Sequence, residues 1–150
     1  MTHTYYQLLY HLVWSTKERR PLITADLQNR LYEYIGGTFR SLKCFPILFG
    51  GIHDHVHLCV EIPPKYALAD IVRNVKVSSS KWVRQNFPIK KEFEWQEGYG
   101  AFSVSPSCKE AVLQYIKNQE IHHKERNFRE EFLLLLQKHA VKYDEKYLWK

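Results

Sequence analysis

The chain has 150 residues, of which 45% are hydrophobic, and it carries a net charge of +6 from 22 Lys and Arg against 16 Asp and Glu. This length and composition predict one compact domain over residues 1–150 and exclude a disordered or linker-rich protein. The positive charge favours polyanionic partners. Aromatic side chains, at 15% of the residues, suit single-stranded nucleic acid when they alternate with basic groups, although filling a core is the simpler explanation of their number.

The three cysteines give no sign of a zinc knuckle or a disulfide framework, because Cys44, Cys59 and Cys108 are widely spaced. The beginning of the chain shows no basic stretch followed by an apolar core, and no run approaches the roughly 20 apolar residues of a membrane span. We therefore expect a cytoplasmic protein with reduced thiols and no membrane association.

In chain order, the first half of the sequence predicts a buried strand, a helix and a β-hairpin, at residues 5–15, 24–43 and 45–62. The charged residues 16–21 separate the strand from the helix. Thr24 is a plausible N-cap, and the helix either ends near Gly36-Gly37 or continues toward Lys43.

The second half predicts an amphipathic helix at 67–87, a glycine-interrupted segment at 93–105 that leads into a last strand, and two further helices at 107–123 and 128–139. Ser107 and Glu110, three residues apart, form a capping-box pattern. No repeat, low-complexity region or linker is visible. The order predicts an α+β fold with a ferredoxin-like antiparallel sheet, helices on one face and the histidine-bearing strand at the centre.

Two groups of basic residues are candidate DNA contacts. The first lies in the charged break and the second on the polar side of the helix at 67–87; they are Lys17, Arg19 and Arg20, and Arg73, Lys76, Lys81 and Arg84. Such cations can contact phosphates, and a solvated surface with no partner explains them equally well.

Three histidines occupy alternate positions in the second strand of the hairpin: His53, His55 and His57. Because alternate side chains of a strand share a face, the three imidazoles are expected to point the same way and could hold a divalent metal. Packing and hydrogen bonding explain many such pairs, so a structural role, or a zinc ion, stays open at this stage.

A tyrosine facing that metal would add a nucleophile. Tyr115 and Gln119 lie four residues apart in the predicted helix at 107–123 and so share a face. A tyrosine oxygen can attack a phosphodiester and form a covalent phosphotyrosine, which conserves the bond energy for rejoining. A helical tyrosine is nevertheless more often part of a core than a catalyst.

Several stretches together resemble the signatures of the single-tyrosine HUH transposases, the small transposases of minimal insertion sequences, which include repeat-associated members. They are DHVHL at 54–58, WQEGYGAFSV at 95–104, YIKNQ at 115–119 with His122-His123 after it, and YHLVWSTK at 10–17 with Arg19-Arg20. The resemblance covers about residues 5–123 in the order of the family and leaves 124–150 as a helical tail.

The resemblance implies a role for each matching residue. His55, His57 and Gln119 correspond to the metal ligands, a set of two imidazoles and an amide oxygen that suits Mn²⁺ and tolerates Mg²⁺. Tyr115 corresponds to the nucleophile, which forms a 5′-phosphotyrosine on single-stranded DNA and releases a 3′-hydroxyl. The family also implies a homodimer that recognises DNA hairpins, often with the tyrosine helix of one subunit completing the histidine site of the other.

His53 departs from the family pattern, and we interpret it as a turn residue more readily than as an extra ligand. Asp54 is expected to order the turn or a histidine rather than to bind metal. Two other functions compete with an active transposase. One is a domesticated repeat-associated tyrosine nuclease, and the other is a non-catalytic nucleic-acid binding module on a similar sheet.

Overall fold

A four-stranded antiparallel sheet forms the centre of the computed structural model, which describes residues 3–87 and 91–150. The strands follow the spatial order β2-β3-β1-β4 and comprise β1 (Leu9–Ser15), β2 (Phe45–Ile52), β3 (His55–Glu61) and β4 (Gly100–Val104). This is the strand order of a ferredoxin-like βαββαβ fold. The predicted α+β class and antiparallel sheet are confirmed, and β3 is one of the two inner strands.

The alternation of side chains along β3 divides the strand between two different environments. Its register against β1 pairs Leu58 with Leu12 and His57 with Val13. Residues directly opposite each other in an antiparallel pair share a face. Leu58 therefore joins the larger apolar core, whereas His57 points to the opposite side of the sheet together with His55.

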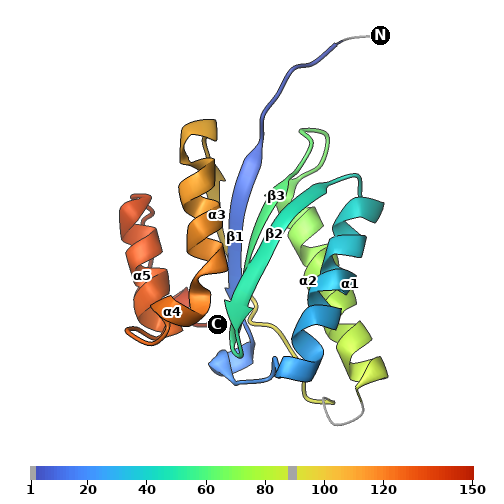
Figure 1. Cartoon of the computed structure of the whole chain (residues 1–150), viewed down its shortest axis with the longest axis vertical. Helices are drawn as coiled ribbons and strands as arrows, with labels where there is room; N and C mark the ends of the chain where they lie inside the picture. Colours follow the sequence, from blue (N-terminus) through green and yellow to red (C-terminus); the bar gives the residue numbers. More distant parts are fainter. Residues whose placement is uncertain (1–2, 88–90) are drawn as a thin grey trace.

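Two long helices cover the first face of the sheet, namely α1 (Ala25–Ser41) and α2 (Leu68–Asn86). The buried side of α1 follows the helical period and consists of Leu27, Leu31, Ile35 and Phe39. Helix α1 runs through Gly36-Gly37, so the longer of the two predicted forms is the one observed. These two helices and one face of the sheet enclose the main core (Figure 1).

The second face carries helices as well, so the prediction that helices lie on one face only is wrong. Helices α3 (Lys109–Lys117), α4 (Gln119–His122) and α5 (Phe128–Lys138) lie on the side of the sheet opposite α1 and α2 (Figure 1). The physical reason is the apolar side of α5, which packs on Val13 and Phe102 of the sheet. This side consists of Phe128, Phe132, Leu135 and Leu136.

The predicted helix at 107–123 is interrupted at Asn118, whose φ of −97° and ψ of 27° end α3 and begin α4. The expected capping box is also absent. The segment Pro106–Cys108 forms a 3₁₀ turn, and the hydroxyl of Ser107 pairs with that of Ser105 instead of capping α3. The remaining short elements are η1 (Lys17–Arg19) and α6 (Glu145–Leu148). Of the helices described, none has the length and apolar character needed to cross a membrane.

Two glycines permit close contacts between the sheet and the second helical layer. A Cβ atom at Gly50 of β2 would lie 2.2 Å from the carbonyl oxygen of Ile116 in α3. A Cβ atom at Gly100 of β4 would lie 2.7 Å from the ring of Phe132 in α5. Because any larger side chain would force these helices outward, both glycines help to define the space between sheet and helices.

Candidate active site

The site is built around the two histidines of β3 that face α3, α4 and α5. Both imidazoles are fully buried. The third histidine of the motif, His53, lies in the hairpin turn, and its side chain is 58% exposed. The expectation that all three share one face is wrong, because the strand begins only at His55 and the backbone turns at His53 and Asp54.

His57 is held between a histidine and a carboxylate. Its Nδ1 lies 2.8 Å from Nε2 of His11 on the neighbouring strand, and its Nε2 lies 3.0 Å from Oε1 of Glu131. Since a carboxylate only accepts hydrogen bonds, Nε2 of His57 carries the proton and Nδ1 accepts from His11. Burial lowers the pKa of His57 to about 4, so the ring is neutral.

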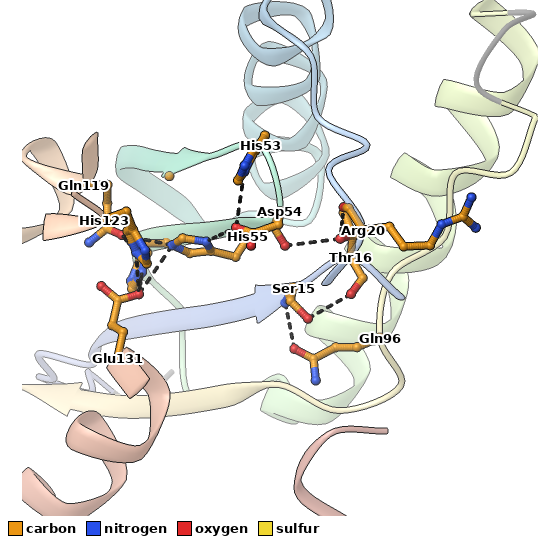
Figure 2. A network of polar contacts seen from close by, with 12 residues as sticks. Ser15, Thr16, Arg20, His53, Asp54, His55, Gln96, Gln119, His123 and Glu131 are labelled. Carbon is orange, nitrogen blue, oxygen red and sulfur yellow. Dashed lines mark hydrogen bonds and ion pairs between the residues drawn. The ribbon is translucent and has the colours of Figure 1, made fainter. Parts of the chain in front are cut away.

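His55 is oriented by the turn that precedes it. Its Nδ1–H donates to Oδ1 of Asp54 at 2.7 Å, and its Nε2 lies 2.9 Å from Oε1 of Gln119. Burial alone would lower the pKa of His55, but hydrogen bonds to Asp54 and Glu131 raise it to about 9. Asp54 thus acts on a histidine, as expected, and belongs to a polar network that continues through Thr16 (Figure 2).

The interruption at Asn118 brings two side chains of the 119–123 region onto the histidine pair. Gln119 is buried, and its Oε1 accepts hydrogen bonds from His55 and, at 3.1 Å, from Nε2 of His123. The amide nitrogen of Gln119 donates to the Tyr115 carbonyl at 3.3 Å. The amide oxygen therefore faces the imidazoles, which is the orientation that a ligand role for Gln119 requires.

Glu131 of α5 lies at the centre of the cluster, and only 1% of its surface is exposed. Its Oε1 is 3.0 Å from Nε2 of His57, 3.1 Å from Nε2 of His123 and 3.4 Å from Nε2 of His55. Burial alone would raise the pKa of Glu131, but hydrogen bonds from these three histidines hold it well below its usual range. The side chain is a buried carboxylate.

Tyr115 of α3 reaches the same carboxylate, because its hydroxyl donates to Oε2 of Glu131. Its ring centroid lies 5.7 Å from that of His57, and the ring stacks on His122 at 4.7 Å. Burial, together with the charge of Glu131, raises the pKa of Tyr115. A groove of about 650 Å³ opens beside the tyrosine and includes Arg126 in its wall.

The donor atoms fit a divalent cation. The ligand atoms of His55, His57 and Glu131 lie within 4.8 Å of one another. The amide oxygen of Gln119 contacts Nε2 of His55, the nitrogen that also faces Glu131. Imidazole nitrogens combined with carboxylate or amide oxygens suit Mn²⁺ and related ions. Asp54 supplies the carboxylate that commonly orients a metal-binding histidine from outside the ligand set.

Most of the candidate DNA-binding cations already have partners within the chain. Side-chain or aromatic partners hold the three in the charged break: Lys17 pairs with Glu94, Arg20 pairs with Glu92, and Arg19 lies over the Trp149 ring. On α2, Arg73 pairs with Asp70, Arg84 donates to the Phe93 carbonyl, and Lys81 is exposed. DNA contact by these exposed residues stays a prediction.

Lys76 differs from the other predicted cations, because it is only 9% exposed. Its ammonium group donates to the backbone carbonyls of Glu97 and Gly98 at 3.0 and 2.8 Å. Burial lowers the pKa of Lys76 to about 8. The expectation that Lys76 belongs to an exposed basic helix face is therefore wrong; the residue fastens α2 to the segment before β4.

The sequence predictions of the site did not include His11 and Glu131. The signal for His11 was present, because a histidine inside the apolar strand β1 needs a polar partner on the same face. Glu131 gave a weaker signal, a single acid three residues after Phe128 on the apolar side of α5. His123 belongs to one of the matching motifs, but the motif alone predicts no contact for it.

Comparisons with known proteins agree with this architecture. Residues 4–119 match the sequence model of the family described as "Transposase IS200 like". This match covers well over half of the chain and includes both histidines, Tyr115 and Gln119. The chain belongs to the IS200-like transposase family, and this membership supports a function as a DNA transposase.

Individual relatives point the same way. The chain is 28% identical over 125 residues to the ISDra2 transposase TnpA of Deinococcus radiodurans, covering 80% of this chain and 88% of the relative. It is 29% identical over 129 residues to the IS200 transposase of Salmonella typhimurium, covering 79% and 81%. Among solved structures, a REP-associated tyrosine transposase bound to a REP hairpin has a similar fold, with a TM-score of 0.61 and 16% sequence identity, and the comparison covers 82% of this chain and 73% of that one.

Proposed function

We propose that this chain cuts and rejoins single-stranded DNA at insertion-sequence ends through a 5′-phosphotyrosine on Tyr115. The proposal assigns His55, His57 and Gln119 as ligands of Mg²⁺ or Mn²⁺. One observation supports it most strongly: the hydroxyl of Tyr115 and the imidazole of His57 contact the same carboxylate group, so a nucleophile and candidate ligands converge within one chain. Family membership independently supports the transposase class.

The reaction needs few groups. A divalent ion held by the histidine pair would polarise an oxygen of the scissile phosphate and stabilise the charge that develops there. The phenolic oxygen of Tyr115 attacks phosphorus, the bond to the 3′-oxygen breaks, and the 3′-hydroxyl leaves with a proton. In the second transfer a 3′-hydroxyl attacks the phosphotyrosine and restores the phenol, so the phosphodiester energy is conserved.

The resting protein holds the nucleophile in its neutral form, since burial and the nearby Glu131 charge raise the pKa of Tyr115. Loss of the phenol proton is therefore expected only when substrate and metal supply positive charge or a proton acceptor. This arrangement would protect the site from reacting before DNA is correctly placed.

We also propose that the whole chain works as one HUH-type domain and that its DNA partner carries a hairpin, as in the structural relative bound to a REP hairpin. We also propose that the chain forms a homodimer, which is an expectation based on the family resemblance. The contact between Tyr115 and Glu131 favours cleavage by the tyrosine of the same subunit as the histidines.

The test is formation of a covalent protein–DNA adduct. The protein is incubated with Mn²⁺ and labelled single-stranded DNA from both sides of its own gene, and adducts that survive denaturing electrophoresis are counted. Tyr115→Phe should abolish the adduct, whereas Tyr34→Phe, on the opposite face of the sheet where its ring stacks on Trp82, should leave it unchanged. Undiminished adduct with Tyr115→Phe would contradict the proposal.

A further inference from the structure

Helix α5 supplies a carboxylate to the active site from outside the region that matches the family. The match ends at residue 119, whereas Glu131 lies in α5. Apolar packing determines the position of α5, because Phe128 and Phe132 on its apolar side pack against the sheet. The Phe128 ring centroid lies 4.7 Å from that of His55, which brings the helix directly over the histidine pair.

This carboxylate is buried among imidazoles. Within residues 3–87 and 91–150, its ion-pair partners are His55, His57 and His123, and none is a Lys or Arg. Removing an ionised carboxylate from water costs several kcal/mol unless it is paired or coordinates a metal. In the metal-free protein the imidazolium of His55 provides that charge, and a divalent cation bound in place of its Nε2 proton would provide it instead.

The distances around Glu131 suit coordination. Its Oε1 lies 3.0 Å from Nε2 of His57 and 3.4 Å from Nε2 of His55. Two ligands at neighbouring corners of an octahedron, each about 2.1 Å from the ion, are about 3 Å apart. The carboxylate oxygen thus lies close to this spacing from each of the two nitrogens, and all three atoms lie within 4.8 Å of one another.

The second oxygen of the carboxylate faces the nucleophile, since Oε2 accepts the hydrogen bond from Tyr115 (the Glu131 side chain is drawn in Figure 2). We propose that Glu131 is a direct ligand of the divalent ion, in addition to His55, His57 and Gln119, and that its other oxygen positions Tyr115 beside that ion. This inference rests on the proposed function, because it requires a metal at the histidine pair.

Metal affinity without DNA tests the inference. Binding of Mn²⁺ is measured by electron paramagnetic resonance for the wild type and for two variants, Glu131→Gln and Glu130→Gln. The second variant is a matched control, because Glu130 is exposed on the same helix. Glu131→Gln should weaken binding by at least about 10-fold, and Glu130→Gln should leave it unchanged. Wild-type or tighter affinity of Glu131→Gln would overturn the assignment.

A measurement on the wild type avoids dependence on a variant that fails to fold. The protein is labelled with ¹³C at glutamate side-chain carboxyls and loaded with Mn²⁺, and electron–nuclear double resonance is recorded. Since Glu131 is the glutamate that the described part of the chain contributes to the ligand cluster, a strong ¹³C coupling is expected. Absence of that coupling would contradict direct ligation.

His57→Ala separates this inference from the proposed function. If His57→Ala loses Mn²⁺ and Glu131→Gln retains it, the metal site stands and only the role of Glu131 fails. If His57→Ala binds Mn²⁺ like the wild type, the proposed metal site itself fails. Increased adduct formation by Glu131→Gln would identify the carboxylate as an obstacle to substrate and would also overturn the ligand assignment.

Discussion

Nε2 of His11 lies 2.8 Å from Nδ1 of His57, and the two rings stack with centroids 5.0 Å apart. This contact between β1 and β3 fixes the orientation of His57 so that its other nitrogen faces Glu131. For His57 to bind a metal through Nε2, the proton must move to Nδ1, and His11 must then accept it as a hydrogen bond.

His11→Phe keeps an aromatic ring in the strand but removes the acceptor. We expect Mn²⁺ affinity to fall by about 10- to 100-fold, because the hydrogen bond that selects the metal-binding form of His57 is lost. His139→Phe serves as the control, since that ring stacks on Phe102 without contacting His57. Calorimetric titration measures both, and equal affinities for the two variants would refute a positioning role for His11.

The stability of the metal-free protein should depend on pH in two opposite ways. Burial alone would lower the pKa of His55, but hydrogen bonds to Asp54 and Glu131 raise it from 6.5 to about 9. Between these two pH values the folded chain therefore retains a proton that the unfolded chain releases. The contribution of His55 to the free energy of unfolding is therefore complete below about pH 6.5 and is lost as pH rises through 9. Burial lowers the pKa of His57 to about 4, so its contribution rises between pH 4 and 6.5.

Thermal melts in chelator should accordingly show a maximum near pH 6.5. Asp54→Asn removes the main hydrogen-bond partner that raises the pKa of His55, so the decline on the alkaline side should become smaller. Titration of the His55 ring by NMR measures the pKa directly. A pKa that stays near 9 in Asp54→Asn would show that Asp54 is not responsible.

Two lysines of α2 should respond differently to neutralisation. Lys81 is exposed, so Lys81→Met should weaken single-stranded DNA binding and reduce the dependence of log affinity on log salt concentration by up to about 0.7. Lys76→Met should leave that slope unchanged and instead destabilise the fold by about 1–3 kcal/mol, because two partly buried carbonyl groups lose their donor. Fluorescence anisotropy at several salt concentrations and chemical denaturation distinguish these outcomes.

Gly50 should be important for activity, because it determines how closely α3 approaches the sheet. In Gly50→Ala the new methyl group would lie 2.2 Å from the Ile116 carbonyl, so the helix that carries Tyr115 must shift by more than about 1 Å, and adduct formation should fall by about 100-fold. Gly37→Ala is the matched control. It meets nothing within 4 Å and should stabilise α1 by about 0.5–1 kcal/mol with unchanged activity.

Strand periodicity and motif spacing predicted much of the fold and part of the site. The alternation at His55 and His57 was sufficient to place both rings on one face, because a strand has a period of two. The spacing of Tyr115 and Gln119 predicted that they would lie near each other, although the interruption at Asn118 changed how Gln119 reaches His55.

The contribution of α5 was not predictable in the same way. Glu131 is 74 positions from His57 in the sequence, and only the packing of the apolar side of α5 on the second face of the sheet brings them together. A local pattern shows that such a helix is amphipathic, but it does not show which face of the sheet the helix covers. The error about helices on one face and the omission of Glu131 have this common cause.

The convergence of Tyr115 and the histidine pair within one chain has a genetic consequence. If each chain carries a complete site, a population that mixes Tyr115→Phe chains with His57→Ala chains contains no functional site, whether or not the chains associate. If sites were shared between subunits, mixed pairs would recover one working site each. Two inactive alleles expressed together should therefore fail to complement each other.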